Sequence, residues 1–219
     1  NVLDYISHLD GGRYFELVGL AEEDLKRNLS YAQNVYRELE EKKFTNYAEF
    51  LSSLQMEAEI APINDLYMDR ITQLINKTNQ FNVTTKRYSQ AEVSTMAQDP
   101  SYITLYGRLK DKFGDHGLIA VTVAKIEGKV ANIDLWLMSC RVLKRDMEQA
   151  MMDEVVSVCQ KRGIEILRGY YIPTPKNAMV VSLFKTLGFA VIKDDQGETT
   201  WEFRIPKDYQ LQNKLINVK

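Results

Sequence analysis

The chain has few of the residues that build disulfide frameworks or metal sites. Its 219 residues include two cysteines, Cys140 and Cys159, which are too few for a disulfide framework, so a reducing cytoplasm is the expected location. The two histidines, His8 and His116, lie far apart in the sequence. No His, Cys, Asp or Glu spacing resembles a metal site, so we predict no metal.

The sequence also lacks a basic excess and a long apolar run. Its 28 Lys and Arg against 30 Asp and Glu give a formal net charge of -2, which argues against a dedicated nucleic-acid binder. No apolar run approaches the roughly 20 residues that cross a bilayer, and there is no signal-peptide pattern, so we expect no membrane segment. Apolar residues make up 45% of the chain and charged residues 26%, as in ordinary globular proteins.

Hydrophobic patterns divide the chain into three parts. Residues 1–55 are predicted to form an N-terminal helical connector, because apolar residues such as Leu25, Leu29 and Leu39 recur there at helical spacing. Residues 56–205 are predicted to form the main domain and residues 206–219 a C-terminal tail. Within the main domain the patterns predict the order β-α-(α)-βββ-α-β-α-ββ.

Two helices of the main domain have a clear apolar face. The first is predicted to be capped by Asn64 or Asp65 and to bury Leu66, Tyr67, Ile71, Leu74 and Ile75. The second is predicted to end near Gly163 and to bury Met147, Ala150, Met151, Val155, Val158 and Cys159. Cys159 is therefore assigned to the core.

Residues 77–88, here called the polar run, read KTNQFNVTTKRY directly after the first of these helices. The run offers side-chain amides and hydroxyls from Asn79, Gln80, Asn82, Thr84 and Thr85, and positive charge from Lys86 and Arg87. One interpretation is a polar wall of a substrate cleft, where the cations attract a carboxylate or phosphate. The alternative is a solvated loop in which Asn79 caps the helix end.

The element order resembles the GNAT superfamily of acetyltransferases, with two local features in support. NAMVVSLFKTLGF (177–189) is similar to the superfamily's late helix, and SCRVLKRDMEQAMM (139–152) lies where the superfamily has its acyl-CoA loop. The resemblance implies an α+β fold with a mixed, mostly antiparallel central sheet flanked by helices. It also implies a gap beside the fifth strand in which the pantetheine arm runs.

The resemblance further implies a set of cofactor-binding residues for acetyl-CoA, another acyl-CoA or a phosphopantetheine thioester. The set is Ser139, Cys140, Arg141, Lys144, Arg145 and Asn177. Arg141 fits the first position of the superfamily's loop motif, whereas Lys144 and Asp146 occupy its two small-residue positions. Phe184 stands where many members have a Tyr that protonates the leaving thiolate, and phenylalanine cannot do this.

A second resemblance covers nearly all of the chain. RITQLINKTNQFNVTTKRYS, FGDHGLIAV, WLMSCRVLKR and YYIPTPKNAMV are together similar to the C-terminal half of FkbH-like proteins. This resemblance implies an upstream haloacid-dehalogenase-like domain that loads a glyceryl unit onto an acyl carrier protein in polyketide-type biosynthesis. The resemblance implies the acyl carrier protein as a partner. The aspartate signature of the upstream domain is absent from this chain, so the glyceryl-loading nucleophile is not in it.

Four further residues are candidates for the site, and three of them have two interpretations. Cys140 is either a nucleophile near a helix start or a small buried residue. His116 is either a base oriented by Asp115 or part of a polar turn. Tyr171 is expected to line the pantetheine gap, and Asn177 contacts ligand or, as we favour, caps a helix.

Two functions remain open from the sequence. One is a transferase that acts on an acyl or glyceryl thioester of coenzyme A or a carrier protein. The other is a non-catalytic module that docks the carrier protein through charge complementarity. The cations expected to serve either function are Lys77, Lys86, Arg87, Arg141, Lys144 and Arg145.

Overall fold

The computed structural model describes residues 33–219 of the chain. The chain divides into two compact units, Asn1–Thr45 and Asn46–Lys219. In the first unit the described residues 33–41 are helical, and the predicted helix positions Leu25 and Leu29 lie outside the described residues. None of the described helices is both long enough and apolar enough to cross a membrane.

The second unit contains the elements predicted from residue 56 onward and, in addition, a helix before them, three 3-10 turns and a short final strand. They are α3 (Tyr47–Ser53), β1 (Glu57–Pro62), the 3-10 turn η1 (Asp65–Tyr67), α4 (Met68–Lys77), α5 (Gln90–Gln98), β2 (Tyr102–Asp111), β3 (Gly114–Glu127), β4 (Val130–Met138), the 3-10 turn η2 (Cys140–Val142), α6 (Met147–Lys161), β5 (Ile166–Tyr171), the 3-10 turn η3 (Ala178–Val180), α7 (Leu183–Thr186), β6 (Ala190–Asp195), β7 (Glu198–Arg204) and β8 (Asn217–Val218). The predicted order β-α-(α)-βββ-α-β-α-ββ is confirmed.

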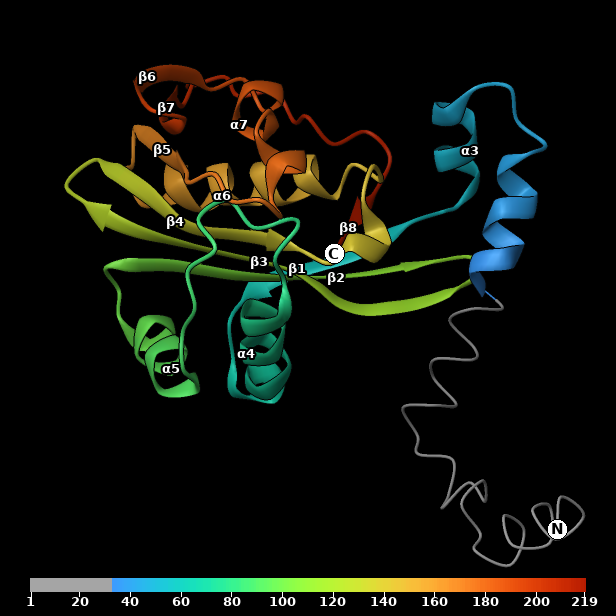
Figure 1. Ribbon diagram of the computed structural model, residues 1–219, viewed down its shortest axis with the longest axis horizontal. Coiled ribbons are helices and arrows are strands. Elements are labelled where there is room, and N and C mark those ends of the chain that lie inside the picture. Colours follow the sequence, from blue (N-terminus) through green and yellow to red (C-terminus); the bar gives the residue numbers. More distant parts are fainter. Residues whose placement is uncertain (1–32) are drawn as a thin grey trace, which may run out of the picture. The chain divides into compact units, whose positions relative to one another are not determined.

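The strands form one mixed sheet in the order β6-β7-β5-β4-β3-β2-β1-β8. All neighbouring pairs are antiparallel except β4 with β5 and β1 with β8, which are parallel. Helices α4 and α5 cover one face of this sheet, and α6 and α7 lie on the other (Figure 1). The predicted fold class, a mostly antiparallel sheet flanked by helices, is therefore confirmed.

Helix α4 packs through the residues that recur at helical spacing. Ile71, Leu74 and Ile75 are buried against β3 and β4 residues such as Val123 and Leu135, and together they form the core on this face. Leu66, predicted to join them, is 79% exposed. It lies in η1, one turn before the α-helix begins, where the helical spacing does not yet apply.

Helix α6 packs just as closely on the opposite face. Met147, Met151 and Cys159 are fully buried, as the sequence predicts. A Cβ atom at Gly107 of β2 would lie 2.5 Å from Met147 Cε, so glycine leaves room for the methionine side chains of α6 against the strand. Burial also raises the pKa of the Cys159 thiol to about 12, which is consistent with a packing residue.

The late helix predicted for residues 177–189 is shorter in the structure. It is replaced by η3 and the four-residue α7, which ends where Gly188 adopts a φ of +88°.

Residues 206–219 are fixed to the unit by Asp153, whose carboxylate accepts hydrogen bonds from Tyr209 Oη (2.7 Å) and the Gln212 and Asn213 amides (2.9 Å each). Strand β8 then pairs with β1.

Candidate functional site

Strands β4 and β5 separate partway along their length. They pair only from Val130–Ile166 to Ile133–Gly169, although β4 continues to residue 138. At the point of separation β4 contains a bulge, because Val123 pairs with Leu135 and Ala124 with Ile133, which leaves Asp134 without a partner on β3. A gap therefore opens between the two central strands.

Residues 81–83 of the polar run occupy this gap as an added strand segment. The Val83 amide donates to the Trp136 carbonyl, the Met138 amide donates to the Phe81 carbonyl (3.1 Å each), and the Ile172 amide beyond β5 donates to the Val83 carbonyl (2.9 Å). Asn82 forms an antiparallel bridge with β4. Phe81 and Val83 are buried, so the gap is closed by the chain's own backbone and side chains.

Two fully buried asparagines hold this segment. Asn82 Oδ1 accepts from the amides of Thr84 (3.3 Å) and Thr85 (2.9 Å), which shapes the turn that follows. Asn177 Nδ2 donates to the carbonyls of Asn82 and Ile172 (2.9 Å each), and its Oδ1 accepts from the Thr174 amide (2.7 Å).

This geometry corrects the role expected for Asn177. Its side chain makes no capping hydrogen bond to η3. The expectation rested on the frequency of asparagine at helix starts, whereas the amide is used to join two segments that are 95 residues apart in the chain.

The next residues of the polar run converge on Asp134 at the bulge. Thr84 Oγ1 donates to the Asp134 carbonyl (2.8 Å), Tyr88 Oη donates to Asp134 Oδ2 (2.6 Å), and Lys86 forms an ion pair with Oδ1. Burial, followed by the bond to Asp134, raises the pKa of the Tyr88 phenol above its ordinary value. The Asp134 carboxylate is therefore engaged by Lys86 and Tyr88, and its backbone carbonyl by Thr84.

Arg87 is also used within the chain. Its guanidinium donates to the carbonyls of Ile75 and Thr78, at the end of α4, and to Asn79 Oδ1. Desolvation lowers the pKa of this guanidinium. Arg87 thus caps the helix end, a role that the sequence analysis considered for Asn79.

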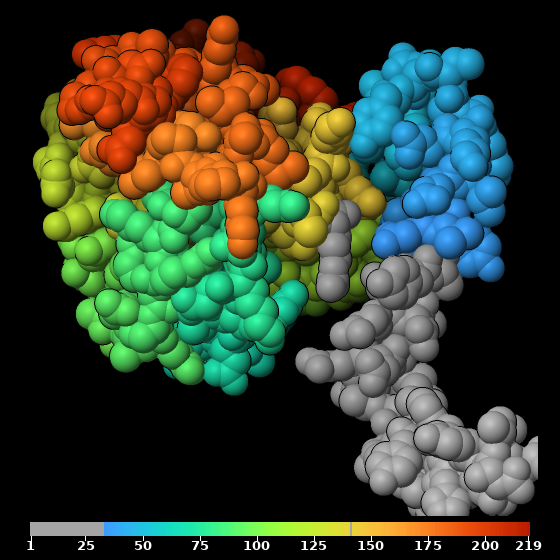
Figure 2. Space-filling view, in the orientation of Figure 1, coloured from blue at the N-terminus to red at the C-terminus, as the bar shows by residue number. Residues whose placement is uncertain are grey.

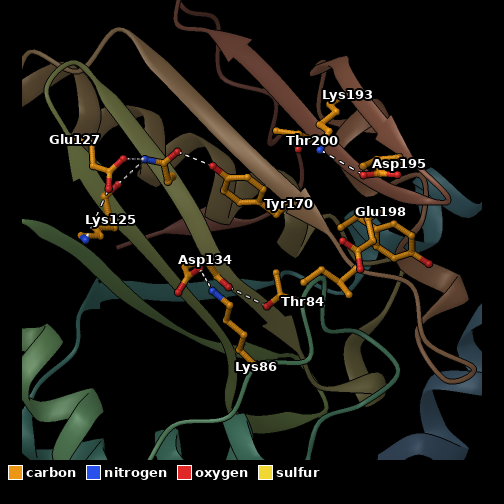
Figure 3. A pocket seen from close by; sticks show the side chains of 14 residues that line it. Thr84, Lys86, Lys125, Glu127, Asp134, Tyr170, Lys193, Asp195, Glu198 and Thr200 are labelled. Atoms are coloured by element: carbon orange, nitrogen blue, oxygen red, sulfur yellow. Dashed lines mark hydrogen bonds and ion pairs between the residues drawn. The ribbon is translucent and has the colours of Figure 1, made fainter.

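One open groove lies over the sheet face beside this network and is here called the sheet-face groove (Figure 3). It has a volume of about 380 Å³ and is lined by Thr84, Lys86, Lys125, Glu127, Asn132, Asp134, Tyr170, Tyr171, Ile172, Lys193, Asp195, Glu198, Thr199 and Thr200. Its lysines face carboxylates: Lys86 pairs with Asp134, Lys125 with Glu127 (3.7 Å) and Lys193 with Asp195 (3.5 Å). Tyr170 Oη donates to Asn132 Oδ1 (2.8 Å).

A second groove lies at the other end of the polar run and is here called the cationic groove. It has a volume of about 650 Å³ and is lined by Arg70, Gln73, Leu74, Lys77, Thr78, Asn79, Gln80, Phe81, Ser139, Cys140 and Lys176. It brings together the predicted site residues Asn79, Gln80, Ser139 and Cys140. In Figure 2 the polar run forms green surface between the teal surface of α4 and the orange surface of the residues that follow β5.

The loop between β4 and α6 keeps an unusual backbone shape. Lys144 and Asp146 both have φ of +61°, in the left-handed region that favours glycine. These are the two positions at which the resemblance expects small residues. The loop therefore has the expected backbone with larger, charged side chains on it. Burial raises the pKa of Asp146, and burial with the nearby Asp146 charge raises that of Glu148 in the first turn of α6.

Arg145, predicted to hold phosphate, points into a buried charge cluster. Its guanidinium contacts Asp111 Oδ2 (3.2 Å) and His116 Nε2 (2.8 Å), and the Asp111 side chain has no exposed surface. His116 lies 3.0 Å from Asp111 Oδ2, within strand β3, and Asp115 instead pairs with Arg108 (3.0 Å). The interpretation of His116 as a turn residue is therefore wrong, since it lies within a strand. Asp115 does not orient it either, because strand alternation sends neighbouring side chains to opposite faces.

The remaining predicted residues are placed as follows. Cys140 is exposed in η2 and lines the cationic groove, so its interpretation as a small buried residue is wrong. Arg141 also lies in η2, and its side chain is outside the described part of the structure. Tyr171 is buried, and burial raises its pKa. Phe184 is buried with its ring on Gly169 and edge-on to Trp136 (6.4 Å between centroids). Over residues 33–219 no group of three His, Cys, Asp or Glu side chains could hold a metal ion.

Sequence reasoning missed Asp134 and Asp111, the two carboxylates that organise these networks. Asp134 could have been noticed as the one charged residue in the apolar strand sequence NIDLWLM. Nothing in the sequence marks Asp111, which resembles an ordinary hairpin residue before Lys112 and Gly114.

No protein-family model and no curated protein sequence matches the chain. Solved structures do match. A GNAT-family acetyltransferase of Streptococcus pneumoniae is 14% identical, with 68% of this chain and 100% of that chain covered and a TM-score of 0.54. The ribosomal-protein-S18-alanine N-acetyltransferase of Escherichia coli is 12% identical, with 70% and 99% covered and a TM-score of 0.51.

The GNAT domain of Streptomyces lividans PAT gives a similar result, with 16% identity, 66% and 89% coverage and a TM-score of 0.52. At such identities the likeness concerns the fold. The chain has the GNAT acetyltransferase fold, as the sequence resemblance predicted, and the resemblance to FkbH-like proteins stays a prediction.

Proposed function

We propose that this chain is the GNAT-fold domain of an FkbH-like protein and that it binds the acyl or glyceryl thioester of an acyl carrier protein in polyketide-type biosynthesis. It does so without drawing acetyl-CoA into the gap between β4 and β5. The observation that carries this proposal is the closure of that gap by residues 81–83.

The closure matters because pantetheine is itself a chain of amides. An open strand edge would offer it the Trp136 carbonyl and the Met138 amide, but both are bonded to residues 81–83. Displacing the segment exposes Phe81 and Val83, at about 1.5–3 kcal/mol for each buried side chain. Each lost hydrogen bond adds about 1 kcal/mol. The total, on the order of 5 kcal/mol, would weaken acetyl-CoA binding roughly a thousandfold or more.

The chemistry of the loop and of α7 supports the same conclusion. Lys144 and Asp146 fill the space that small residues would leave for a pyrophosphate, and the carboxyls of Asp146 and Glu148 would repel it. Phe184 offers no proton for a leaving thiolate. Each feature disfavours acetyl transfer from coenzyme A.

Carrier binding draws support from the cations that remain available. Of the predicted basic set, Lys86, Arg87 and Arg145 are engaged within the chain, whereas Lys77 and Lys144 are exposed. Lys176, on the cationic groove, is exposed as well. Carrier proteins are typically acidic, so these lysines provide charge complementarity.

Calorimetry with three ligands tests the proposal: acetyl-CoA, acyl-loaded carrier protein, and the carrier without its phosphopantetheine arm. The expected result is binding of the loaded carrier, weaker binding of the carrier that lacks the arm, and no binding of acetyl-CoA below millimolar concentration. Micromolar binding of acetyl-CoA would overturn the proposal, and so would a loaded carrier that does not bind.

Acyl transfer is the second candidate, and one observation favours it. The left-handed backbone at Lys144 and Asp146 keeps the shape of a phosphate-binding loop. The test is whether a loaded thioester is consumed on incubation with the chain, followed by mass spectrometry of the carrier. Catalytic consumption of the thioester would establish a transferase. An unchanged thioester would support the first candidate, a module that only binds the carrier.

A further inference from the structure

The cationic groove contains positive charge without negative charge. Its lining includes Arg70, Lys77 and Lys176 and no Asp or Glu within the described part of the chain, although the whole chain has a net charge of -2. Four separate segments contribute: the last turns of α4, residues 78–81, residues 139–140 and Lys176 after β5. A groove lined by charge of one sign raises the local concentration of counter-ions, so this groove favours an anionic ligand.

Two of these charges are free to meet a ligand. Lys77 and Lys176 have no ion-pair or hydrogen-bond partner for their ammonium groups among residues 33–219. Both side chains are exposed. Arg70 lies beside Gln73 at the rim, where its guanidinium donates to the Gln73 amide oxygen. The sheet-face groove differs, since its lysines each face a carboxylate.

The end of α4 would normally weaken an anion site, because a helix carries partial negative charge at its C-terminus. Here Arg87 donates to the carbonyls of Ile75 and Thr78. Those carbonyls are therefore satisfied, and the guanidinium offsets the helix dipole. The potential in the groove is therefore set mainly by Lys77 and Lys176.

The neutral lining adds hydrogen-bond donors and an apolar wall. Thr78, Asn79, Gln80 and Ser139 carry hydroxyl or amide groups, and Phe81 contributes ring surface where it leaves the closed gap. The volume of about 650 Å³ exceeds that of a single phosphate ion. It matches the range of about 300–1,000 Å³ typical of small-molecule sites.

We propose that the cationic groove binds the phosphate of a phosphate ester, with Lys77 and Lys176 as its charge partners and the polar wall 78–80 against the organic part. The ester has two sources with the same chemistry. One is the phosphodiester of a carrier protein's phosphopantetheine arm, which rests on the proposed function. The other is a free phosphate ester.

The first experiment measures binding of phosphopantetheine and of inorganic pyrophosphate by calorimetry. The variants Lys77→Gln and Lys176→Gln each remove one charge at an exposed position, so folding is not at risk. Each should weaken binding about 5- to 20-fold, the usual effect of one charge-assisted hydrogen bond. Lys193→Gln, in the sheet-face groove, is the matched control and should leave the affinity unchanged.

Cys140 provides an independent readout. Both cysteines of the chain are described; Cys140 is exposed at this groove and Cys159 is buried, so a thiol reagent reaches Cys140 alone in the folded protein. Phosphopantetheine at saturating concentration should slow the alkylation of Cys140. The double variant Lys77→Gln/Lys176→Gln should lose this protection.

The outcomes separate this inference from the proposed function. If phosphopantetheine binding depends on Lys77 and Lys176 but the loaded carrier does not bind, the groove stands and the source is a free phosphate ester. If the loaded carrier and phosphopantetheine both bind equally well to the wild-type chain and the double variant, the proposed function stands and the groove inference is overturned. Failure of both phosphate probes to bind also overturns it.

Discussion

The two grooves at the ends of the polar run use similar residues in opposite ways. In the sheet-face groove, Lys86 is paired with Asp134 and the other lysines face acids of their own. In the cationic groove, Lys77 and Lys176 have no such partner among the described residues. Compensated charge stabilises the fold at one end, and uncompensated charge at the other end is available for a ligand. Residues 81–83, which close the gap between β4 and β5, separate the two.

The largest effect on the free energy of unfolding is expected at Asn177, which holds residues 81–83 in the gap. Asn177→Ala removes the donor to the carbonyls of Asn82 and Ile172 and the acceptor of the Thr174 amide, all of them in a buried region. The free energy of unfolding should fall by about 3 kcal/mol, because buried groups without partners cost about 1–3 kcal/mol each. Urea denaturation measures this.

Asn79→Ala is the matched control, because Asn79 is exposed and only accepts from Arg87. It should lower the free energy of unfolding by less than about 1 kcal/mol. Hydrogen exchange adds a local readout: the Val83 and Ile172 amides should exchange faster in Asn177→Ala relative to the core of β3. Equal stability of the two variants would mean that Asn177 does not hold the gap closed.

The second prediction is that a single substitution gives the sheet-face groove an unpaired lysine, as in the cationic groove. Asp134→Asn removes the charge that pairs with Lys86 and accepts from Tyr88. The loss in the free energy of unfolding should be about 1–2 kcal/mol, modest because the ion pair is partly exposed. Lys86 then lacks a counter-charge, so the sheet-face groove should acquire weak affinity for pyrophosphate.

That affinity is best measured in the Lys77→Gln/Lys176→Gln background, in which the cationic groove is silent. The test variant is then Lys77→Gln/Lys176→Gln/Asp134→Asn. Adding Lys86→Gln to this triple variant is the control and should abolish the new pyrophosphate binding. If pyrophosphate binds neither with Asp134 present nor with Asp134→Asn, removing the counter-charge of a lysine is insufficient to create a phosphate site.

The fold was more predictable than the site for reasons visible in particular residues. Ile71, Leu74 and Ile75, or Met147 and Met151, repeat at helical spacing, and such periodicity records which face is buried. The polar run has no periodicity, because its groups serve partners far along the chain: Asn82 meets Asn177, and Tyr88 meets Asp134. No local pattern encodes these pairings.

The same reasoning explains the errors at His116 and Leu66. Each was assigned from its immediate neighbours, a turn for His116 and a helix face for Leu66. The structure extends β3 through His116, so its partner Asp111 lies across the hairpin. It begins α4 only at Met68, so Leu66 is turned to solvent. Element boundaries are the least certain feature of a sequence-based reading.

The third prediction concerns Glu148, a carboxyl that lines another groove to which Phe81 also contributes. Burial and the nearby Asp146 raise the pKa of Glu148 above its ordinary 4.5. A carboxyl with a raised pKa in the folded state adds stability below pH 4.5 that is lost as the pH rises through the folded-state pKa. Glu148→Gln does not titrate, so it should be more stable than wild type at pH 7, by about 0.5–1 kcal/mol.

As the pH falls well below 4.5, the free energies of unfolding of the two proteins should converge, because Glu148 becomes protonated in both states. Glu154→Gln, on the same helix, is the control, and its stability should differ little from wild type at either pH. A Glu148→Gln variant that is less stable than wild type at pH 7 would mean that the ionised carboxylate is stabilised by a partner.

The smallest effects on stability give the clearest contrast between the grooves, because substitutions in the two grooves should change stability in opposite directions. Lys193→Gln removes a cation that faces Asp195, so at low salt it should destabilise the fold slightly, by less than about 0.5 kcal/mol. Lys176→Gln removes a cation that shares its groove only with other cations, so it should be neutral or slightly stabilising by a similar amount. Both effects should shrink when the salt concentration is raised to about 1 M, where the Debye length is about 3 Å. Urea denaturation of the two variants at low and high salt measures the difference. Destabilisation by Lys176→Gln that salt relieves would place a negative charge near Lys176 and remove the distinction between the two grooves.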